Sequence, residues 1–343
     1  MATRAAGAQS RVRCCKRVPI DHGRGVASDL LDTPAEVIHM LSRSQQAVPV
    51  FALNMGVKIH EARRQKIAAL FPELDPERLA FALTSADEQG AMAFAREPFD
   101  SELFGLEIGR ITGARASSAA EYRCLFEAVL CRARMAGYDQ VLRRTAVANL
   151  AEVWGLEGAG FELMDVGVTF AQKVAPGMRQ AVSHSDLQVA LSTDADIEAI
   201  ARDMVLEPWA SRYEADPAYA PERVRELRSR WLANLHRGRA QAFFVGTMDG
   251  QPAGYVTCNV DGRTGIGDIE LVGTMPAFRG RRVASRVMEH ALWWFGTRTN
   301  LVTVRTQATN IGAATLYERA GFTLHSSDLT FRAAIRPSHS GSV

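Results

Sequence analysis

Hydrophobic and polar residues alternate along the second half of the chain in a way that predicts strands and helices in turn. Residues 186–192 (DLQVALS) alternate with the period of a strand. Thr193 and Asp194 then cap a helix whose apolar Ile197 and Ile200 recur on one face. The elements predicted next are a short helix and an amphipathic helix within 207–240, a β-hairpin over 243–260 turned at Asp249-Gly250, a strand over 266–275, a helix just after 279–285, and a strand over 301–307.

Upstream of residue 96 the same patterns predict a small α/β extension behind a basic tail. The first twenty residues hold five basic residues and no acid, which predicts a solvated tail. The extension is predicted to contain a capped helix over 32–41, a strand over 48–53, a helix over 58–71 and a strand over 78–85.

Two stretches of the chain resemble each other closely. Residues 149–161 (NLAEVWGLEGAGF) match residues 310–322 (NIGAATLYERAGF) at an offset of 161, the difference between 310 and 149. Arg144-Thr145 matches Arg305-Thr306 at the same offset. Each copy predicts a helix, a strand, a loop with Asn, a second helix and a closing strand, so we interpret the chain as two related modules. In these stretches the second copy alone carries a tyrosine, Tyr317.

Composition and charge narrow the possible functions. The 343 residues suffice for two hydrophobic cores, and a net charge of +2 gives no footprint for nucleic acid. No apolar run is long enough to span a bilayer. The five cysteines lack zinc-ligand spacing, and no pair of the eight histidines has metal-ligand spacing on a helix. We therefore expect a cytoplasmic protein without a metal, a membrane contact or a nucleic-acid partner.

A basic turn joins the strand over 266–275 to the helix that follows. Its sequence, PAFRGRRVAS (276–285), places small residues and arginines at a predicted helix N-terminus. Such termini bind phosphate through free N–H groups and the helix dipole, and arginines add charge-assisted contacts. A basic turn on a solvated surface has the same composition, so the turn alone leaves both interpretations open.

Three motifs together resemble the GNAT superfamily of acyl-CoA N-acyltransferases: RGRRVA (279–284), VRTQATN (304–310) and N-x-x-A-x-x-L-Y-x-x-x-G-F (310–322). Within it, the chain is similar to the TDP-fucosamine acetyltransferase type, which acetylates the amine of a nucleotide-linked 4-amino-4,6-dideoxysugar. This closer resemblance is carried by FDSELFG (99–105), residues 211–238 and residues 155–170. It implies a mixed α/β sheet with two GNAT-like modules in tandem, the first degenerate. The expected bounds are an extension over 1–95, a degenerate half over 96–175, a catalytic domain over 186–335 and a tail over 336–343.

The resemblance also implies direct transfer of an acetyl group from acetyl-CoA to an amine. The backbone near Val272 to Thr274 would hold the donor and polarise its thioester carbonyl, and Tyr317 would protonate the departing thiolate. Asn310 serves equally well as a helix cap, and a core aromatic is the alternative for Tyr317. The implied donor-binding residues are Val272, Gly273, Thr274, Arg279, Gly280, Arg281, Arg282, Val283, Ala284 and Asn310.

The acceptor side is less constrained by the sequence. Glu270 or Asp268 would take the ammonium proton, with Glu270 preferred, although either also suits a solvated strand. An exposed loop joined by salt bridges is the alternative for most of the acceptor contacts that the resemblance implies, which are Arg212, Tyr213, Asp216 and Gln307.

One residue departs from the family's phosphate loop, R-x-x-G-x-G/A. Arg282 replaces the middle glycine, where its side chain would either crowd the pyrophosphate or bind phosphate itself. This departure leaves room for a donor carried on the phosphopantetheine of an acyl carrier protein.

At the offset of 161 the first copy lacks both functional features. RGRRVA falls on residues 118–123, which put Glu121 where a phosphate would sit, and Tyr317 falls on Leu156. Our leading hypothesis is an N-acetyltransferase that uses acetyl-CoA on a nucleotide-linked amino sugar. The alternatives are an N-acyltransferase of natural-product biosynthesis, with another small-molecule amine or a carrier-bound donor, and a non-catalytic thioester-binding module. The oligomeric state is left open.

Overall fold

The computed structural model describes residues 50–53, 68–85, 90–174, 186–206 and 211–335. The helix expected over 32–41, most of the helix expected over 58–71, the basic tail and the C-terminal tail lie outside these ranges. No helix in the described ranges is both long and apolar enough to cross a membrane.

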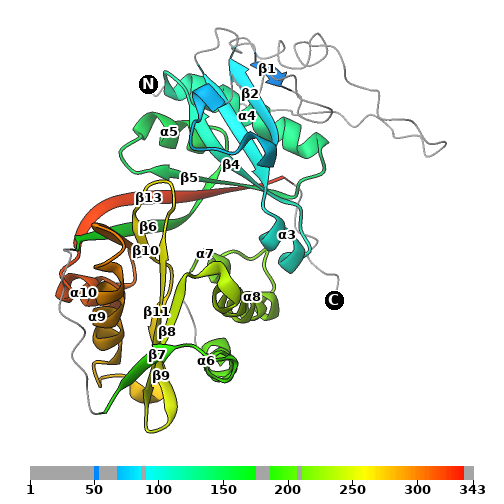
Figure 1. The fold of residues 1–343 in the computed structure, drawn as a ribbon. Coiled ribbons are helices and arrows are strands. Elements are labelled where there is room, and N and C mark those ends of the chain that lie inside the picture. The colour runs from blue at the N-terminus through cyan, green and yellow to red at the C-terminus, as the bar shows by residue number, and fades with distance from the viewer. Residues whose placement is uncertain (1–49, 54–67, 86–89, 175–185, 207–210, 336–343) are drawn as a thin grey trace, which may run out of the picture.

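Thirteen strands in the described residues form one long twisted sheet (Figure 1). Its order is β1-β2-β3-β4-β5-β13-β6-β12-β10-β9-β8-β7, and β11 pairs with β9 alone. The strands are β1 (Val50–Leu53), β2 (Leu79–Ser85), β3 (Ala91–Arg96), β4 (Ile108–Arg115), β5 (Gln140–Ala146), β6 (Glu162–Lys173), β7 (Gln188–Leu191), β8 (Ala242–Met248), β9 (Gln251–Val260), β10 (Gly267–Ile269), β11 (Val272–Thr274), β12 (Leu301–Gln307) and β13 (Thr323–Ala334).

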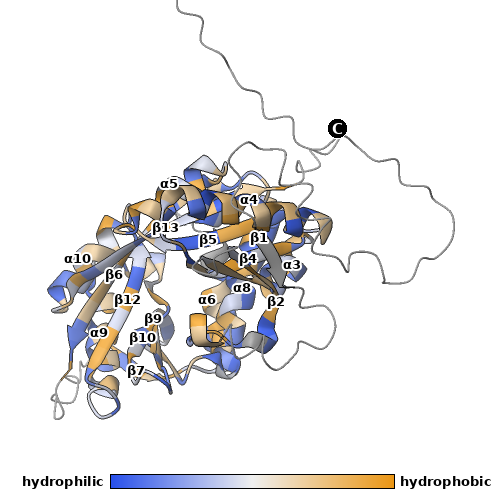
Figure 2. Cartoon of the chain, turned by 90° about the horizontal axis from the view of Figure 1, so that it is seen from above, coloured by the Kyte–Doolittle hydropathy of each residue, from blue (hydrophilic) through white to orange (hydrophobic). Residues whose placement is uncertain are grey.

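The helices cover both faces of this sheet. They are α3 (Pro98–Phe104), α4 (Ala119–Met135), α5 (Leu150–Gly158), α6 (Asp194–Leu206), α7 (Arg212–Ala215), α8 (Pro221–Asn234), α9 (Val283–Phe295) and α10 (Ile311–Arg319). In the second module α9 and α10 lie on one side of the strands, and α6 and α8 lie on the other (Figure 1). Along β12 the residues change from hydrophobic to hydrophilic, as Figure 2 shows from above.

The repeat seen in the sequence is a repeat of structure. Adding 161 to the bounds of β5, α5 and β6 gives the bounds of β12, α10 and β13. The prediction of two related modules in a mixed α/β sheet is therefore confirmed. We call β1 to β6 the first module and β7 to β13 the second module.

The two modules exchange their closing strands, which the sequence analysis did not anticipate. β13, the last strand of the second module, pairs with β5 of the first. β6, the last strand of the first module, pairs with β12 of the second, and β6 and β13 pair with each other. Phe331 of β13 is accordingly buried in the first module's core, and Phe170 of β6 in the second module's core.

The exchange has a local two-fold symmetry centred on one residue pair. Gly167 of β6 lies opposite Asp328 of β13, and these two positions are themselves related by the offset of 161. A Cβ atom at Gly167 would lie 1.9 Å from Nη2 of Arg305, so this position must be glycine for Arg305 to lie across it.

Two expectations about boundaries need correction. The boundary expected at residue 95 falls inside the sheet, because β3 pairs with β4 along its length and β2 pairs with β3. Phe81 and Phe94 on these strands pack in the first module's core, so the first module includes residues that were assigned to the extension. The second correction concerns the α9 helix, which begins at Val283 rather than after Ser285.

We predict that neither module forms its native fold alone. A fragment of residues 186–335 lacks β5 and β6, which leaves the edges of β12 and β13 unpaired and exposes Phe331. This fragment should show no cooperative thermal transition, whereas fragments 68–174 and 186–335 expressed together should elute as a 1:1 complex from a sizing column. A cooperative transition with native circular dichroism for the isolated fragment would contradict the strand exchange.

Candidate active site

A gap opens in the sheet of the second module between β11 and β12. β12 pairs with β10 only from Val302 to Val304, whereas β11 pairs with β9 alone. The continuous strand expected over 266–275 is thus two short strands separated at Glu270 and Leu271. The Thr257 hydroxyl accepts a hydrogen bond from the Leu271 amide at 2.9 Å, which anchors the chain where it bends away from β12.

The backbone of β11 presents free groups to this gap. Leu271 and Met275 form hydrogen-bonded pairs with β9. The Thr257 N–H donates to the Leu271 carbonyl, and the Met275 N–H donates to the Ala253 carbonyl. Because hydrogen-bonded and non-hydrogen-bonded pairs alternate along an antiparallel ladder, the N–H and C=O groups of Val272 and Thr274 point away from β9 and toward the gap.

Gly273, between them, is required for a packing reason that the sequence did not reveal. A Cβ atom there would lie 2.5 Å from the hydroxyl oxygen of Tyr255, whose ring packs on β11. Tyr255 is 4% exposed, and burial raises the pKa of its phenol above the usual range. The smooth course of β11 past this ring therefore depends on the absence of a side chain at position 273.

The N-terminus of α9 lies beside β11. Val283, the first residue of the helix, is so close to Gly254 and Gly273 that a Cβ at Gly254 would meet its Cγ1 at 2.5 Å. The preceding residues 279–282 are exposed, and Ala284 is half-buried in the first helical turn. This arrangement leaves the first N–H groups of α9 near the gap, as expected for a phosphate-binding turn.

Arg282 occupies the glycine position of this turn in a glycine-like conformation. Its φ is 59° and its ψ is 24°, in the left-handed region, and Gly280 nearby has a φ of 78°. Arg281 instead faces Asp249, 3.4 Å away, and lies over the ring of Phe278. The backbone of the family's loop is thus retained although the side chain at 282 is large.

Tyr317 points from α10 into the second module's core beside the gap. It is 4% exposed, and its ring centroid lies 5.7 Å from that of Phe170 and 6.2 Å from that of Phe322. Burial raises the pKa of its phenol to about 12. In the described part of the chain no residue forms a hydrogen bond with this hydroxyl, although a buried phenol ordinarily has a partner.

Asn310 caps α10, one of the two roles that the sequence left open. Its side-chain oxygen accepts a hydrogen bond from the Ala313 amide at 3.1 Å. Its counterpart Asn149 caps α5 in the same way, accepting from Glu152 at 3.3 Å. Capping therefore accounts for the asparagine in both modules.

The equivalent gap of the first module is filled by an ion pair. Arg143 donates to the carbonyl of Ile111 at 3.1 Å, and its Nε lies 2.6 Å from the Glu152 carboxylate. Thr145 and Asn149 also donate to Glu152, at 2.7 and 2.8 Å. By strand register Ile111, which lies opposite Arg143, corresponds to Ile269, which lies opposite Val304, so Arg143 stands where the second module has a buried apolar residue.

Small or apolar residues stand at the equivalent places in the second module. Val304 replaces Arg143 and Ala313 replaces Glu152 at the offset of 161. Leu156, the counterpart of Tyr317, is fully buried in the first module's core. The first module thus holds a buried ion pair where the second module has apolar or small residues.

The helix N-terminus of the first module is closed as well. Ser118 caps α4 by accepting from the Glu121 amide at 3.2 Å, and Glu121 accepts from the Ser117 amide at 2.8 Å and its hydroxyl at 2.7 Å. Glu121 thus bonds the residue before the N-cap, in a variant of the capping box in which a carboxylate of the chain lies where an external anion would bind.

The two candidate bases, Asp268 of β10 and Glu270 just after it, differ in their surroundings. Glu270 accepts a hydrogen bond from Nε1 of Trp231 at 2.6 Å and lies 2.9 Å from the Arg239 guanidinium. Asp268 accepts from the Thr303 hydroxyl at 3.2 Å. Burial raises the pKa of Asp268, an effect that the Thr303 hydrogen bond opposes and the charge of Glu270 increases.

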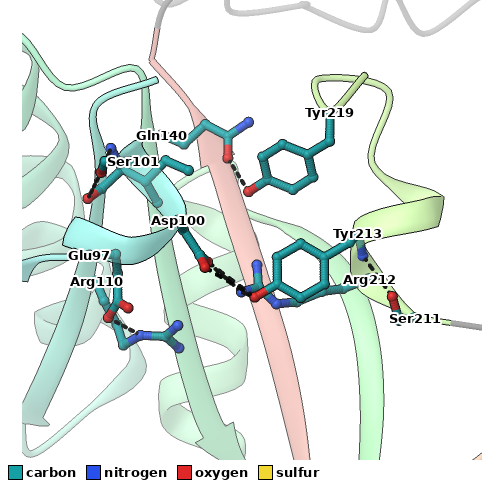
Figure 3. Close-up of polar contacts among 10 residues, drawn as sticks. Glu97, Asp100, Ser101, Arg110, Gln140, Ser211, Arg212, Tyr213 and Tyr219 are labelled. Carbon is teal, nitrogen blue, oxygen red and sulfur yellow. Dashed lines mark hydrogen bonds and ion pairs between the residues drawn. The ribbon is translucent and has the colours of Figure 1, made fainter. Parts of the chain in front are cut away.

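The expected acceptor-binding residues connect the two modules. Arg212 of α7 lies 3.0 Å from the Asp100 carboxylate of α3 and donates to the Tyr213 hydroxyl, which donates to Asp100 at 3.1 Å (Figure 3). Asp216 is 3% exposed and pairs with Arg332 of β13 at 2.5 Å.

Gln307, the fourth of the expected residues, lies at the end of β12. Its backbone faces the gap, because Val304, Thr306 and Ala308 are the positions that hydrogen-bond β6 on the other side. Arg212, Tyr213 and Asp216 thus hold α7 against the first module, and Gln307 is nearest to the gap.

Several residues of this region were missed by the sequence analysis. Asp100 was quoted only as part of a motif, and Tyr219, whose hydroxyl donates to Gln140 at 2.9 Å, only as part of a longer stretch (Figure 3). Trp231 and Arg239 carried no signal, because their contact with Glu270 depends on the packing of α8. The repeat did contain a usable signal for Arg143 and Glu152, namely polar residues opposite apolar ones at the same offset.

Residues 202–322 match the sequence model of the acetyltransferase (GNAT) family. This match spans α9, α10 and the gap, which are the parts on which the geometry above depends. The second module is therefore a GNAT acetyltransferase domain, and the chain is an enzyme of the GNAT type.

Known proteins of similar sequence or structure cover both modules. The spore coat polysaccharide biosynthesis protein SpsD of Bacillus subtilis is 24% identical over 243 residues, which are 70% of this chain and 82% of that protein. A tandem GNAT protein from the clavulanic acid biosynthesis pathway is similar in fold, with a TM-score of 0.54, 13% identity, and coverage of 75% of this chain and 83% of its own. A GCN5-related N-acetyltransferase from Sphaerobacter thermophilus has a TM-score of 0.52, 14% identity, and coverage of 80% and 86%.

We predict that Arg282→Gly stabilises the protein. The left-handed conformation costs a side-chain-bearing residue roughly 1–2 kcal/mol, part of which the flexibility of glycine in the unfolded chain offsets, so the free energy of unfolding should rise by up to about 1 kcal/mol. Urea denaturation measures this, with Arg281→Gly as the matched control that has no positive φ to relieve. A less stable Arg282→Gly variant would contradict the strain argument.

Proposed function

We propose that the second module transfers an acetyl group from acetyl-CoA to the primary amine of a nucleotide-linked amino sugar. The observation that carries this proposal is the contrast between the two gaps. In the second module Val272 and Thr274 turn free backbone groups away from β9, and Val304 and Ala313 beside them are apolar, whereas in the first module Arg143 and Glu152 form a buried ion pair at the positions of Val304 and Ala313.

The donor would lie across β11 with its phosphates at the N-terminus of α9. Val272 and Thr274 would hold its pantetheine arm and polarise the thioester carbonyl with a backbone N–H, aided by Gly273, which keeps β11 close to Tyr255. The exposed turn over 279–284 and the Asn310 cap complete the site. We favour free acetyl-CoA over a carrier-bound donor, because the glycine-like backbone of Arg282 retains the loop that recognises the pyrophosphate.

Tyr317 would act as the general acid. The amine attacks the thioester carbon, the bond to sulfur breaks, and the phenol gives its proton to the departing thiolate. Because burial raises the pKa of Tyr317 to about 12, the phenol stays protonated at the pH at which an acceptor amine begins to lose its proton. The absence of a hydrogen-bond partner within the described residues leaves the hydroxyl available to the donor sulfur.

The base would be one of two carboxylates, Asp268 of β10 or Glu270 just after that strand, with Glu270 preferred. Trp231 and Arg239 both contact Oε1 of Glu270, which fixes the direction of the carboxylate. Asp268 lies two residues away on the same face and is the alternative.

The proposed class of acceptor is inferred from the pathway for which the relative SpsD is named. SpsD is named for polysaccharide biosynthesis, and its similarity to this chain extends over 243 residues, 70% of the chain. Polysaccharides are assembled from activated sugars, so an amino sugar carried by a nucleotide fits that setting. The second candidate, an amine of natural-product assembly, is supported by the fold shared with the tandem GNAT protein of clavulanic acid biosynthesis.

A thiol-release assay tests the proposed function directly. The purified chain is incubated with acetyl-CoA and a panel of amines that includes nucleotide-linked 4-amino-4,6-dideoxysugars, free amino sugars, polyamines and amino acids. The proposal expects the highest kcat/KM for a nucleotide-linked sugar. Preference for an amine without a nucleotide, or for an acetylated carrier protein over acetyl-CoA, would reject the acceptor or the donor respectively.

We predict that Tyr317→Phe retains its fold and loses about 10²–10⁴-fold in kcat, the usual contribution of a positioned general acid. The fold is retained because the hydroxyl makes no hydrogen bond with the described residues. Tyr122→Phe in the first module is the control and should leave transfer unchanged. A loss within a few-fold for Tyr317→Phe, or a larger loss for Tyr255→Phe, would assign the acid elsewhere.

We predict that Glu270→Gln lowers kcat/KM by about 10²-fold at neutral pH, the lower end of general-base effects. The remaining activity should rise with pH in proportion to the neutral fraction of the amine, since no carboxylate then takes its proton. The pH profiles of Glu270→Gln and Asp268→Asn distinguish the two acids. A larger loss in Asp268→Asn would make Asp268 the base.

A further inference from the structure

Two arginines related by the repeat, Arg305 and Arg144, lie near the centre of the exchanged strands. They differ in how strongly each pairs with the carboxylate of Asp328. Arg305 of β12 holds Asp328 with two hydrogen bonds, Nε to Oδ2 at 2.9 Å and Nη2 to Oδ1 at 2.7 Å. Its counterpart, Arg144 of β5, lies 3.4 Å from the same carboxylate, and its side chain remains 45% exposed.

The inequality has a simple structural cause. In the symmetric arrangement the acid that pairs with Arg144 would stand at position 167, the counterpart of Asp328. Position 167 is glycine, and the Arg305 guanidinium occupies the space above it. Asp328 therefore serves both arginines, and Arg305, which also lies 3.7 Å from Asp165, has the stronger pairing.

A buried polar atom beside Arg144 also lacks a partner. Thr330 of β13 lies directly opposite Arg144 on one side and Asp165 of β6 on the other. Its side chain is fully buried, and in the described residues nothing forms a hydrogen bond with its hydroxyl. Buried hydroxyl groups normally have a protein, water or ligand partner, so a further polar group belongs at this place.

The same face of the sheet leads from Arg144 to the reaction site. Thr303, which bonds Asp268, alternates along β12 with the core residues Val302 and Val304, so Arg305 and Gln307 share its face. From β12 the face continues over β6 and β13 to β5, three strand spacings or about 14 Å. A polar surface thus extends from the candidate bases to Arg144.

We propose that Arg144, with Thr330 beside it, binds a phosphate group of the acceptor's nucleoside diphosphate. This inference rests on the proposed function and adds to it a specificity residue from the first module. An arginine that is half-exposed and weakly paired can form a bidentate contact with phosphate without first breaking a strong ion pair. The acceptor would then lie across the exchanged strands, with its phosphates over β5 and its sugar toward the carboxyl end of β12, since the registers place Arg144 level with that end of β12.

Electrostatics in the cluster favour an added anion. Partial burial and then the nearby charge of Arg305 lower the pKa of Arg144 to about 10, which leaves it positively charged at neutral pH. A phosphate on its exposed side would counter the repulsion from Arg305. Asp328 would not be displaced, because Arg305 holds both of its oxygens.

The test is a binding measurement that does not depend on turnover. Calorimetry measures the binding of dTDP, UDP and inorganic pyrophosphate to the full chain with CoA at saturation, so that the donor site is occupied. Arg144→Ala should weaken the best of these probes by about 10- to 100-fold, the value of a charge-assisted contact, and Arg144→Lys should recover part of the loss. Arg123→Ala, which removes an exposed arginine of α4 paired with Glu127, is the matched control and should change nothing.

Kinetics separate this inference from the proposed function. Arg144→Ala should raise the KM of a nucleotide-linked amino sugar by a similar factor, with kcat and the Kd of CoA little changed. If the parent acetylates such a sugar and Arg144→Ala keeps its KM, the Arg144 subsite is rejected and the proposed function stands. If the parent binds none of the three probes, the subsite is rejected whatever amine is acetylated. If a probe binds through Arg144 but no sugar is acetylated, the subsite stands and the proposed reaction is rejected.

Discussion

The ladder of backbone hydrogen bonds between the exchanged closing strands is the constraint on which this molecule depends. Each module contributes its last strand to the sheet of the other, so β12, which borders the candidate thioester gap, is held on its other edge by β6 of the first module. The first module's core likewise needs Phe331 from β13. The position of the gap relative to β5 is thus set by a continuous sheet and not by a linker, and a ligand that spans both modules meets a fixed surface.

Within this shared frame the two modules differ through a few buried side chains. Arg143 and Glu152 form a buried ion pair at the positions where the second module has Val304 and Ala313, and Glu121 takes the place of an anion at one helix N-terminus. Buried charges are tolerated only when paired and hydrogen-bonded, which explains why Thr145 and Asn149 also donate to Glu152. The donor site of the second module therefore depends on what is absent from its walls as much as on Tyr317.

Much of the fold was predictable from the sequence, because the offset of 161 aligns β5, α5 and β6 with β12, α10 and β13 without a gap. The strand exchange was not, since the apolar pattern of β13 fits its own module and its neighbour equally well. The same limit applies to the site: the motifs located Tyr317 and the turn at 279–284, whereas the partners of Glu270, Trp231 and Arg239, lie far away in the chain. The break between β10 and β11 was hidden inside one apolar run.

The ion pair of Arg143 and Glu152 in the first module also makes it difficult for single mutations to restore a second active site. Replacing Glu152 alone would leave the Arg143 charge unpaired in the interior. Such a change typically lowers the free energy of unfolding by about 3–5 kcal/mol, which is a large share of a domain's stability. Replacing Arg143 alone would instead leave the Glu152 carboxylate buried without its charge partner. Two working sites would require both substitutions together with a tyrosine at position 156 and a new phosphate-binding turn. Single mutations toward that state lower stability, so the chain keeps one working site in the second module.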